Sequence, residues 1–116
     1  MKTVNILGTD YNIYFVDEFP DYLSEVGENA GGLCNRNDRD IWIKRCNDKD
    51  MTDAGRERCD KDVLRHEIIH AYLSESGLSA NASHYYGSWA ENEEMVDWFA
   101  IQSPKIFQTF KEVDCL

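Results

Sequence analysis

The chain has 116 residues, of which 42% are hydrophobic, 12% aromatic and 29% charged. This composition is typical of a folded domain with one core and excludes a disordered or fibrous chain. Asp and Glu total 22 against 12 Lys and Arg, and the resulting formal charge of −10 repels the phosphate backbone of nucleic acids. We therefore expect a single domain over residues 1–116 that does not bind nucleic acid.

Neither an export signal nor a membrane segment is expected. Polar residues interrupt the first apolar run before it reaches the length of a signal-peptide core, and no run approaches the roughly 20 apolar residues that cross a bilayer. Four scattered cysteines, Cys34, Cys46, Cys59 and Cys115, lack the C-x-x-C spacing of structural zinc sites. We expect a cytoplasmic protein with mostly reduced thiols, a Cys34–Cys46 or Cys46–Cys59 disulfide being the less favoured alternative.

The first half of the chain is rich in strand signals. Residues 4–7 and 11–16 are β-branched and aromatic and flank the turn residues 8–10, which predicts a hairpin. Residues 17–28 fit a short helix that ends near Gly27. After a polar stretch, residues 41–44 predict another strand, either in a second hairpin or at a sheet edge. The Trp42 side chain could line a substrate pocket, although packing on the sheet is the more common role.

Helical patterns dominate the second half. The polar residues 47–53 predict a loop, after which Asp60 or Asp62 could cap a helix that ends at Gly77. Arg65 is expected on the solvated face of this helix, together with Arg56 and Arg58. A further helix is predicted over residues 89–102, and Ser103 and Pro104 should interrupt it. Residues 106–113 then predict an amphipathic turn or two that packs back on the domain.

The segment His66-Glu67-Ile68-Ile69-His70 carries the strongest functional signal. Histidines four residues apart on a helix lie on one face, so both rings can reach one metal ion, and zinc suits them. The neighbouring Glu67 can accept a proton from a water activated by the metal instead of acting as a ligand. His66 and His70 are therefore predicted zinc ligands and Glu67 a general base.

A catalytic zinc ion usually has a third protein ligand, and here it must come from outside this helix. The candidates are His84, Glu93, Glu94 and Asp97. Helical spacing places Glu93 on the face of Val96 and Ala100, which favours an inward orientation for Glu93. Glu94 shares its face with Trp98 and Ile101, which are also apolar, so the residues alone leave the choice open.

HEIIH followed by the segment E-E-M-V-D-W-F-A (residues 93–100) resembles the gluzincin metallopeptidases and, among them, the ImmA/IrrE family of phage and mobile elements. This resemblance covers roughly residues 41–102 and implies Glu93 as the third ligand and Asp97 as the acceptor of a histidine N–H. Val96 stands where the family has Ala, and Asp97 where it has Asn. A histidine fourteen residues after the motif also resembles SprT-like proteases, which would make His84 the ligand. That family has a glycine directly after this histidine, whereas Tyr85 follows here.

We expect an α+β domain with a small twisted sheet packed on the His66–His70 helix and on a second helix that carries Glu93. The predicted function is zinc-dependent hydrolysis of peptide bonds, with Tyr85 and Tyr86 as possible donors to the oxyanion. The alternative is a zinc-binding protein without turnover. The ImmA/IrrE resemblance implies a protein substrate, such as a phage or mobile-element repressor. The oligomeric state cannot be deduced from the residues.

Overall fold

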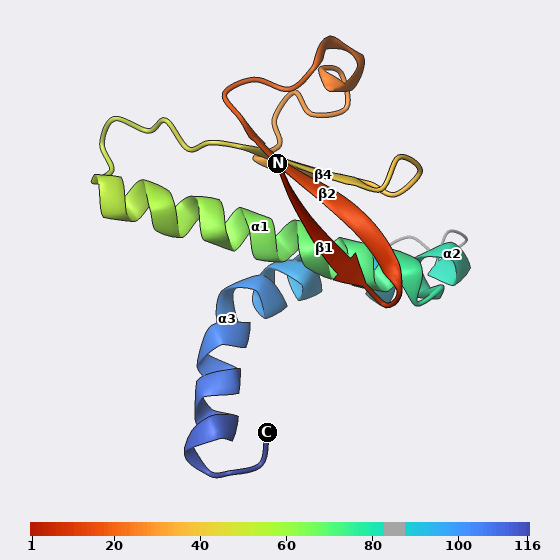
Figure 1. Ribbon diagram of the computed structural model, residues 1–116. Helices are drawn as coiled ribbons and strands as arrows, with labels where there is room; N and C mark the ends of the chain where they lie inside the picture. The colour runs from red at the N-terminus through yellow and green to blue at the C-terminus, as the bar shows by residue number, and fades with distance from the viewer. Residues whose placement is uncertain (83–87) are drawn as a thin grey trace.

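The computed structural model describes residues 1–82 and 88–116, in which a four-stranded sheet packs on helices (Figure 1). The strands are β1 (Lys2–Ile6), β2 (Thr9–Val16), β3 (Gly32–Asn35) and β4 (Asp40–Lys44), and the helices are α1 (Asp53–Glu75), α2 (Leu78–Ala82) and α3 (Glu93–Glu112). Two short 3-10 turns cover Asp21–Leu23 and Trp89–Glu91. The expected α+β class is confirmed, but the sheet packs on α1, and α3, which carries Glu93, packs on α1 instead of on the sheet as expected.

The strand order is β1-β2-β4-β3, in which β2 and β4 are parallel and the two outer pairs are antiparallel. The predicted first hairpin is present, but it turns at Leu7 and Gly8, whose φ angles of 50° and 92° suit a two-residue turn. Thr9 and Asp10 therefore belong to β2. β4 lies inside the sheet as the second strand of the β3–β4 hairpin, so the alternative of an edge strand at residues 41–44 is wrong. The edge is β3.

One face of the sheet forms the main core and rests on α1. Tyr11, Ile13, Ile41 and Ile43 alternate along β2 and β4, point to this face and are at most 4% exposed. They cluster with the buried Ala71 and with partly buried residues of α1, namely Val63, Leu64 and Ile68. The burial of each isoleucine side chain stabilises the folded state by about 1.5–3 kcal/mol, so this layer holds α1 against the sheet.

The opposite face of the sheet is partly covered by aromatic packing. Trp42 stacks on Tyr14 with ring centroids 4.3 Å apart, so its role is packing on the sheet and not lining a substrate pocket. The expected helix over residues 17–28 is reduced to the 3-10 turn at Asp21–Leu23. Pro20, which precedes this turn, has an extended ψ of 151°, and this backbone conformation separates the turn from the residues before it.

Helix α1 begins earlier than expected, because Thr52 and not Asp60 or Asp62 caps it. The Thr52 hydroxyl accepts a hydrogen bond of 3.0 Å from the N–H of Gly55. The Asp60 carboxylate instead accepts from the N–H of Cys46, and Asp62 pairs with Arg65. The predicted end is confirmed: Ser76 is the C-cap and Gly77 follows with a φ of 84°.

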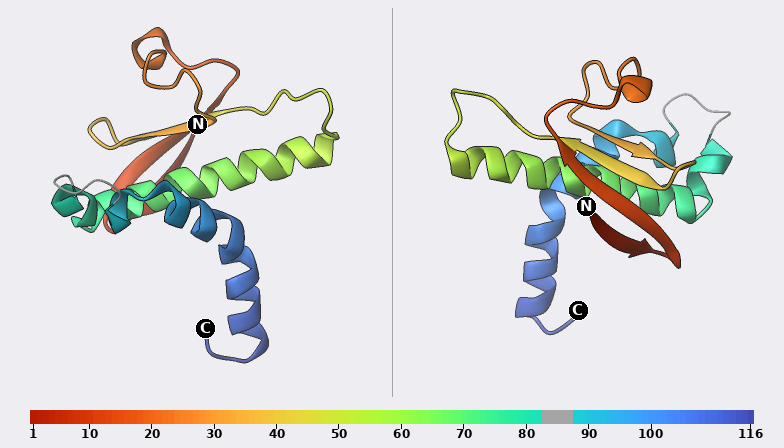
Figure 2. Two further views of the ribbon diagram at one scale, coloured as in Figure 1. Left: turned by 180° about the vertical axis from the view of Figure 1, so that it is seen from behind. Right: turned by 45° about the horizontal axis from the view of Figure 1, so that its top comes forward.

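Helix α3 runs through Pro104 without interruption, contrary to expectation. Its first half lies along α1, whereas its second half turns away and projects from the body of the molecule (Figures 1 and 2). Phe107 and Phe110 are 55% and 40% exposed, so the expected packing of this segment on the domain is not observed. None of the described helices is long and apolar enough to span a membrane.

A contact between α1 and α3 explains how Pro104 is tolerated. Proline has no N–H, so the carbonyl of Ala100, four residues earlier, loses its helical donor. The Nε of Arg65 donates a hydrogen bond of 2.6 Å to this carbonyl. Arg65 therefore does not lie on a solvated face, as the sequence suggested, but joins α1 to α3 one residue before His66.

Candidate metal centre

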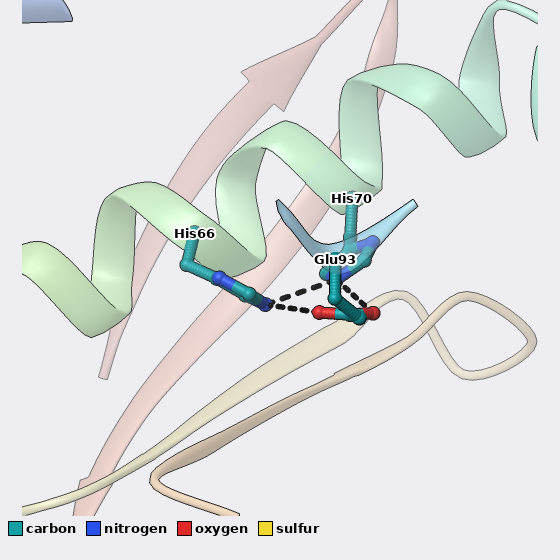
Figure 3. A group of neighbouring side chains, drawn as sticks. All are labelled: His66, His70 and Glu93. Carbon is teal, nitrogen blue, oxygen red and sulfur yellow. Dashed lines mark hydrogen bonds and ion pairs between the residues drawn. The ribbon is translucent and has the colours of Figure 1, made fainter. Parts of the chain in front are cut away.

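The two histidines of the HEIIH segment project from α1 toward the start of α3 (Figure 3). One helical turn separates them, and their Nε2 atoms are 3.1 Å apart. The side chains of His66 and His70 are 19% and 21% exposed. Both rings therefore reach the same point at the surface of α1 while their stems are packed.

Glu93, the first residue of α3, completes a group of three (Figure 3). Its Oε2 lies 3.0 Å from Nε2 of His66, and its Oε1 lies 3.2 Å from Nε2 of His70. These ligand atoms all lie within 4.8 Å of one another, so the three residues could hold a metal ion. Among the described residues no other group of three or more His, Cys, Asp or Glu side chains has this property.

Local sequence explains why Glu93 and not Glu94 faces the histidines. The Asn92 side chain accepts a hydrogen bond of 3.0 Å from the N–H of Met95 and so starts α3 at Glu93. Val96 and Ala100, on the face of Glu93, are 0% and 2% exposed.

On the face of Glu94, by contrast, Trp98 and Ile101 are 53% and 51% exposed. This difference in burial decides between Glu93 and Glu94, a choice that the apolar pattern alone left open.

The donor set itself fits a cation. Nδ1 of His66 lies 2.6 Å from Oδ1 of Asp97, and when this nitrogen donates its proton to the carboxylate, Nε2 keeps only a lone pair. That lone pair faces Nε2 of His70 and the carboxylate of Glu93, so the three side chains converge on one point where a cation could bind. Two imidazole nitrogens and a carboxylate oxygen are donor types that zinc takes in catalytic sites, so the residues fit this metal.

Glu67 lies beside this group but is not one of its members. It is 6% exposed, and its burial raises the pKa of its carboxyl; with the opposing effect of His66 and the further increases from Glu93 and Asp97 included, this pKa is about 7. β3 lies close against the Glu67 side chain. A Cβ added at Gly32 would lie only 2.8 Å from Cγ of Glu67. No local pattern in the sequence predicts this contact between Gly32 and Glu67.

A cleft of about 750 Å³ opens between β3, α1 and α3. His66, Glu67, His70 and Glu93 line it together with Gly32 and Cys34 of β3. The N–H of Lys44 bonds to the carbonyl of Gly31, and hydrogen-bonded pairs alternate along an antiparallel ladder. The main-chain groups of Gly32 and Cys34 therefore point away from β4, toward the free edge of the sheet.

Three residues that the sequence analysis considered lie outside the described residues. They are His84, the alternative ligand, and Tyr85 and Tyr86, the possible oxyanion donors. Their roles stay predictions.

No family model, curated protein or solved structure matches this chain. The likeness to the ImmA/IrrE and SprT-like families thus rests on the motif residues alone.

Proposed function

We propose that this protein is a zinc-dependent metallopeptidase in which His66, His70 and Glu93 bind the metal and Glu67 is the general base. The observation that carries the proposal is a buried carboxylate beside a three-residue ligand group that lines an open cleft. A structural zinc site usually closes all four positions with protein ligands and has no role for such a carboxylate. The alternative of a zinc-binding protein without turnover leaves Glu67 unexplained.

The residues divide the chemistry between them. Zinc, when bound, acidifies water and polarises the carbonyl of the scissile bond. Glu67 accepts the proton of the attacking water and passes it to the leaving amine, a role that suits a buried carboxylate beside the ligand group. Asp97 accepts the Nδ1 proton of His66 and so keeps the Nε2 lone pair directed at the metal.

The free edge of β3 supports an extended peptide as the substrate. The main-chain groups of Gly32 and Cys34 point toward the free edge of the sheet, and both residues line the cleft, so a peptide can add there as a further strand. This mode of binding depends on the peptide backbone and imposes little sequence preference. On the ImmA/IrrE resemblance, the substrate is a regulatory protein such as a repressor of a phage or mobile element.

Metal analysis of single variants tests the ligand set. We expect about one zinc per chain in the wild type and a large loss in His66→Ala and Glu93→Ala. Glu94→Ala is the matched control, because it removes the same side chain one residue further along an exposed face of α3. His84→Ala tests the alternative ligand. Zinc that is lost from His84→Ala and kept by Glu93→Ala would refute the ligand set.

Glu67→Gln separates catalysis from metal binding. This change preserves the size of the side chain and removes its basic oxygen, so zinc content should stay at the wild-type level while hydrolysis falls about 10²-fold or more. The release of new amino termini from a denatured protein mixture measures the reaction. Equal hydrolysis by the wild type and the variant would remove Glu67 from the mechanism. A zinc-loaded wild type that cleaves neither this mixture nor a candidate repressor would favour the non-catalytic alternative.

A further inference from the structure

Two cysteines outside the metal centre lie next to each other at the start of α1. Cys46 follows β4, and Cys59 lies seven residues before His66. The main-chain N–H of Cys46 donates a hydrogen bond of 2.8 Å to the carboxylate of Asp60, the residue after Cys59. This bond holds the segment between β4 and α1 against the helix at the level of Cys59.

The side chains in this region bring sulfur atoms together. The thiol of Cys46 lies close enough to Cys59 to raise the pKa of the Cys59 thiol, and Sγ of Cys46 lies 3.7 Å from Sδ of Met51. Both cysteines are partly exposed, so a small oxidant can reach them. Cys34 differs from them, because burial raises the pKa of its thiol to about 12 and keeps it unreactive.

We propose that Cys46 and Cys59 form a reversible redox site that a glutathione-type disulfide oxidises to an intramolecular disulfide. One thiolate attacks the oxidant, breaks its S–S bond and releases one glutathione thiol. The second cysteine then attacks the resulting mixed disulfide and releases the other glutathione. Two protein thiols are oxidised, one glutathione disulfide is reduced, and the two thiol protons end on the two released glutathiones.

The surroundings of the pair predict how its oxidation depends on pH. Partial burial raises the pKa of Cys59, and the neighbouring Cys46, Asp60 and Asp48 raise it further. Since the thiolate is the attacking species, the disulfide should form slowly at neutral pH and faster as the pH rises. Because the acidic residues raise the pKa of Cys59 and slow the reaction, only prolonged oxidising conditions should form the disulfide at neutral pH.

The disulfide would connect the segment after β4 to the second turn of α1. It closes a loop between residues 46 and 59, and a loop of this size is expected to raise the Tm by roughly 12 °C. Cys59 lies about two helical turns from His66, so zinc content should not change. The inference is therefore independent of the proposed peptidase activity.

Thiol counting and peptide mapping test the proposal in a Cys115→Ser variant, which removes the exposed thiol that could join two chains. In a glutathione redox buffer we expect the number of free thiols to fall from three to one, with Cys34 remaining free. Trypsin should then release residues 46–49 linked to residues 59–61, and the Tm should rise as above. The same linked peptides are expected from the oxidised wild type.

Cys46→Ser and Cys59→Ser in the same background are the controls, and neither should show the rise in Tm. A folded Cys115→Ser chain that keeps three thiols in fully oxidising buffer would overturn the proposal. A stable glutathione adduct on either cysteine, or a linkage of Cys46 or Cys59 to Cys34, would overturn it as well. The wild-type peptide map decides the matter if the Cys115→Ser variant does not fold.

Discussion

Gly32→Ala tests the contact between β3 and the proposed general base. An alanine Cβ at this position would lie 2.8 Å from Cγ of Glu67 and 2.8 Å from Cγ1 of Val63. Carbon atoms in contact are normally about 3.5–4.0 Å apart, so either the strand or both side chains must move. Overpacking of this kind costs about 1–3 kcal/mol of unfolding free energy. We expect the variant to be destabilised by that amount.

The adjacent glycine offers a matched control. A Cβ at Gly31 would lie 3.4 Å from the nearest atom of Val63, which is an ordinary contact. Both substitutions reduce the entropy of the unfolded chain equally, so their difference in stability isolates the clash at Gly32. Urea unfolding should place Gly31→Ala within about 0.5 kcal/mol of the wild type. Equal stability of the two variants would refute the placement of β3 against Glu67.

The same pair of variants bears on catalysis. The three atoms nearest to the added Cβ of Gly32 belong to Glu67 and Val63 and not to a proposed ligand, so zinc content should be unchanged. A displacement of Glu67 by about 1 Å could lower turnover about 10²-fold. A Gly32→Ala chain that loses zinc instead would show that the strand supports the ligands and not the base.

Three further changes test the site and the fold. Asp97→Ala removes the acceptor for a histidine N–H and should weaken zinc affinity about 10–100-fold in a chelator competition. Ile43→Ala should cost about 2–5 kcal/mol in urea unfolding, because Ile43 is fully buried, whereas the exposed Phe107→Ala should stay within about 0.5 kcal/mol; similar losses would contradict the projecting second half of α3. Tyr11→Phe removes a 2.7 Å hydrogen bond that lowers the pKa of Glu75. A carboxyl whose pKa is lowered in the folded state stabilises the protein at pH values above the unfolded-state pKa of about 4.3. The loss of unfolding free energy in this variant should therefore be full at neutral pH and shrink as the pH falls below about 4.3.

Features that depend on neighbours in sequence could be predicted from the sequence. The first hairpin follows from β-branched residues around Leu7 and Gly8, and the end of α1 from Gly77, because local backbone preferences determine both. Helical periodicity aligned His66 with His70 before any tertiary contact was known. Only the tertiary structure shows that the Glu93 side chain faces the histidines. The pattern of apolar neighbours favoured this orientation but did not decide it.

Other features depend on contacts between residues far apart in the chain, and no local pattern encodes them. β3 became the edge strand because β4 pairs in parallel with β2, a pairing that spans the whole segment between them. Helix α3 survives Pro104 because Arg65, on another helix, donates to the carbonyl that the proline leaves free.

The sequence by itself thus determined the chemistry of the site, since two histidines and a glutamate on one helix turn are a local pattern. Tertiary structure decided what surrounds it. The burial of Glu67 under Gly32, the orientation of the Glu93 carboxylate toward the two histidines, and the cleft beside β3 all arise from packing. Packing depends on the sum of many distant contacts, so these features appear only when the chain is folded.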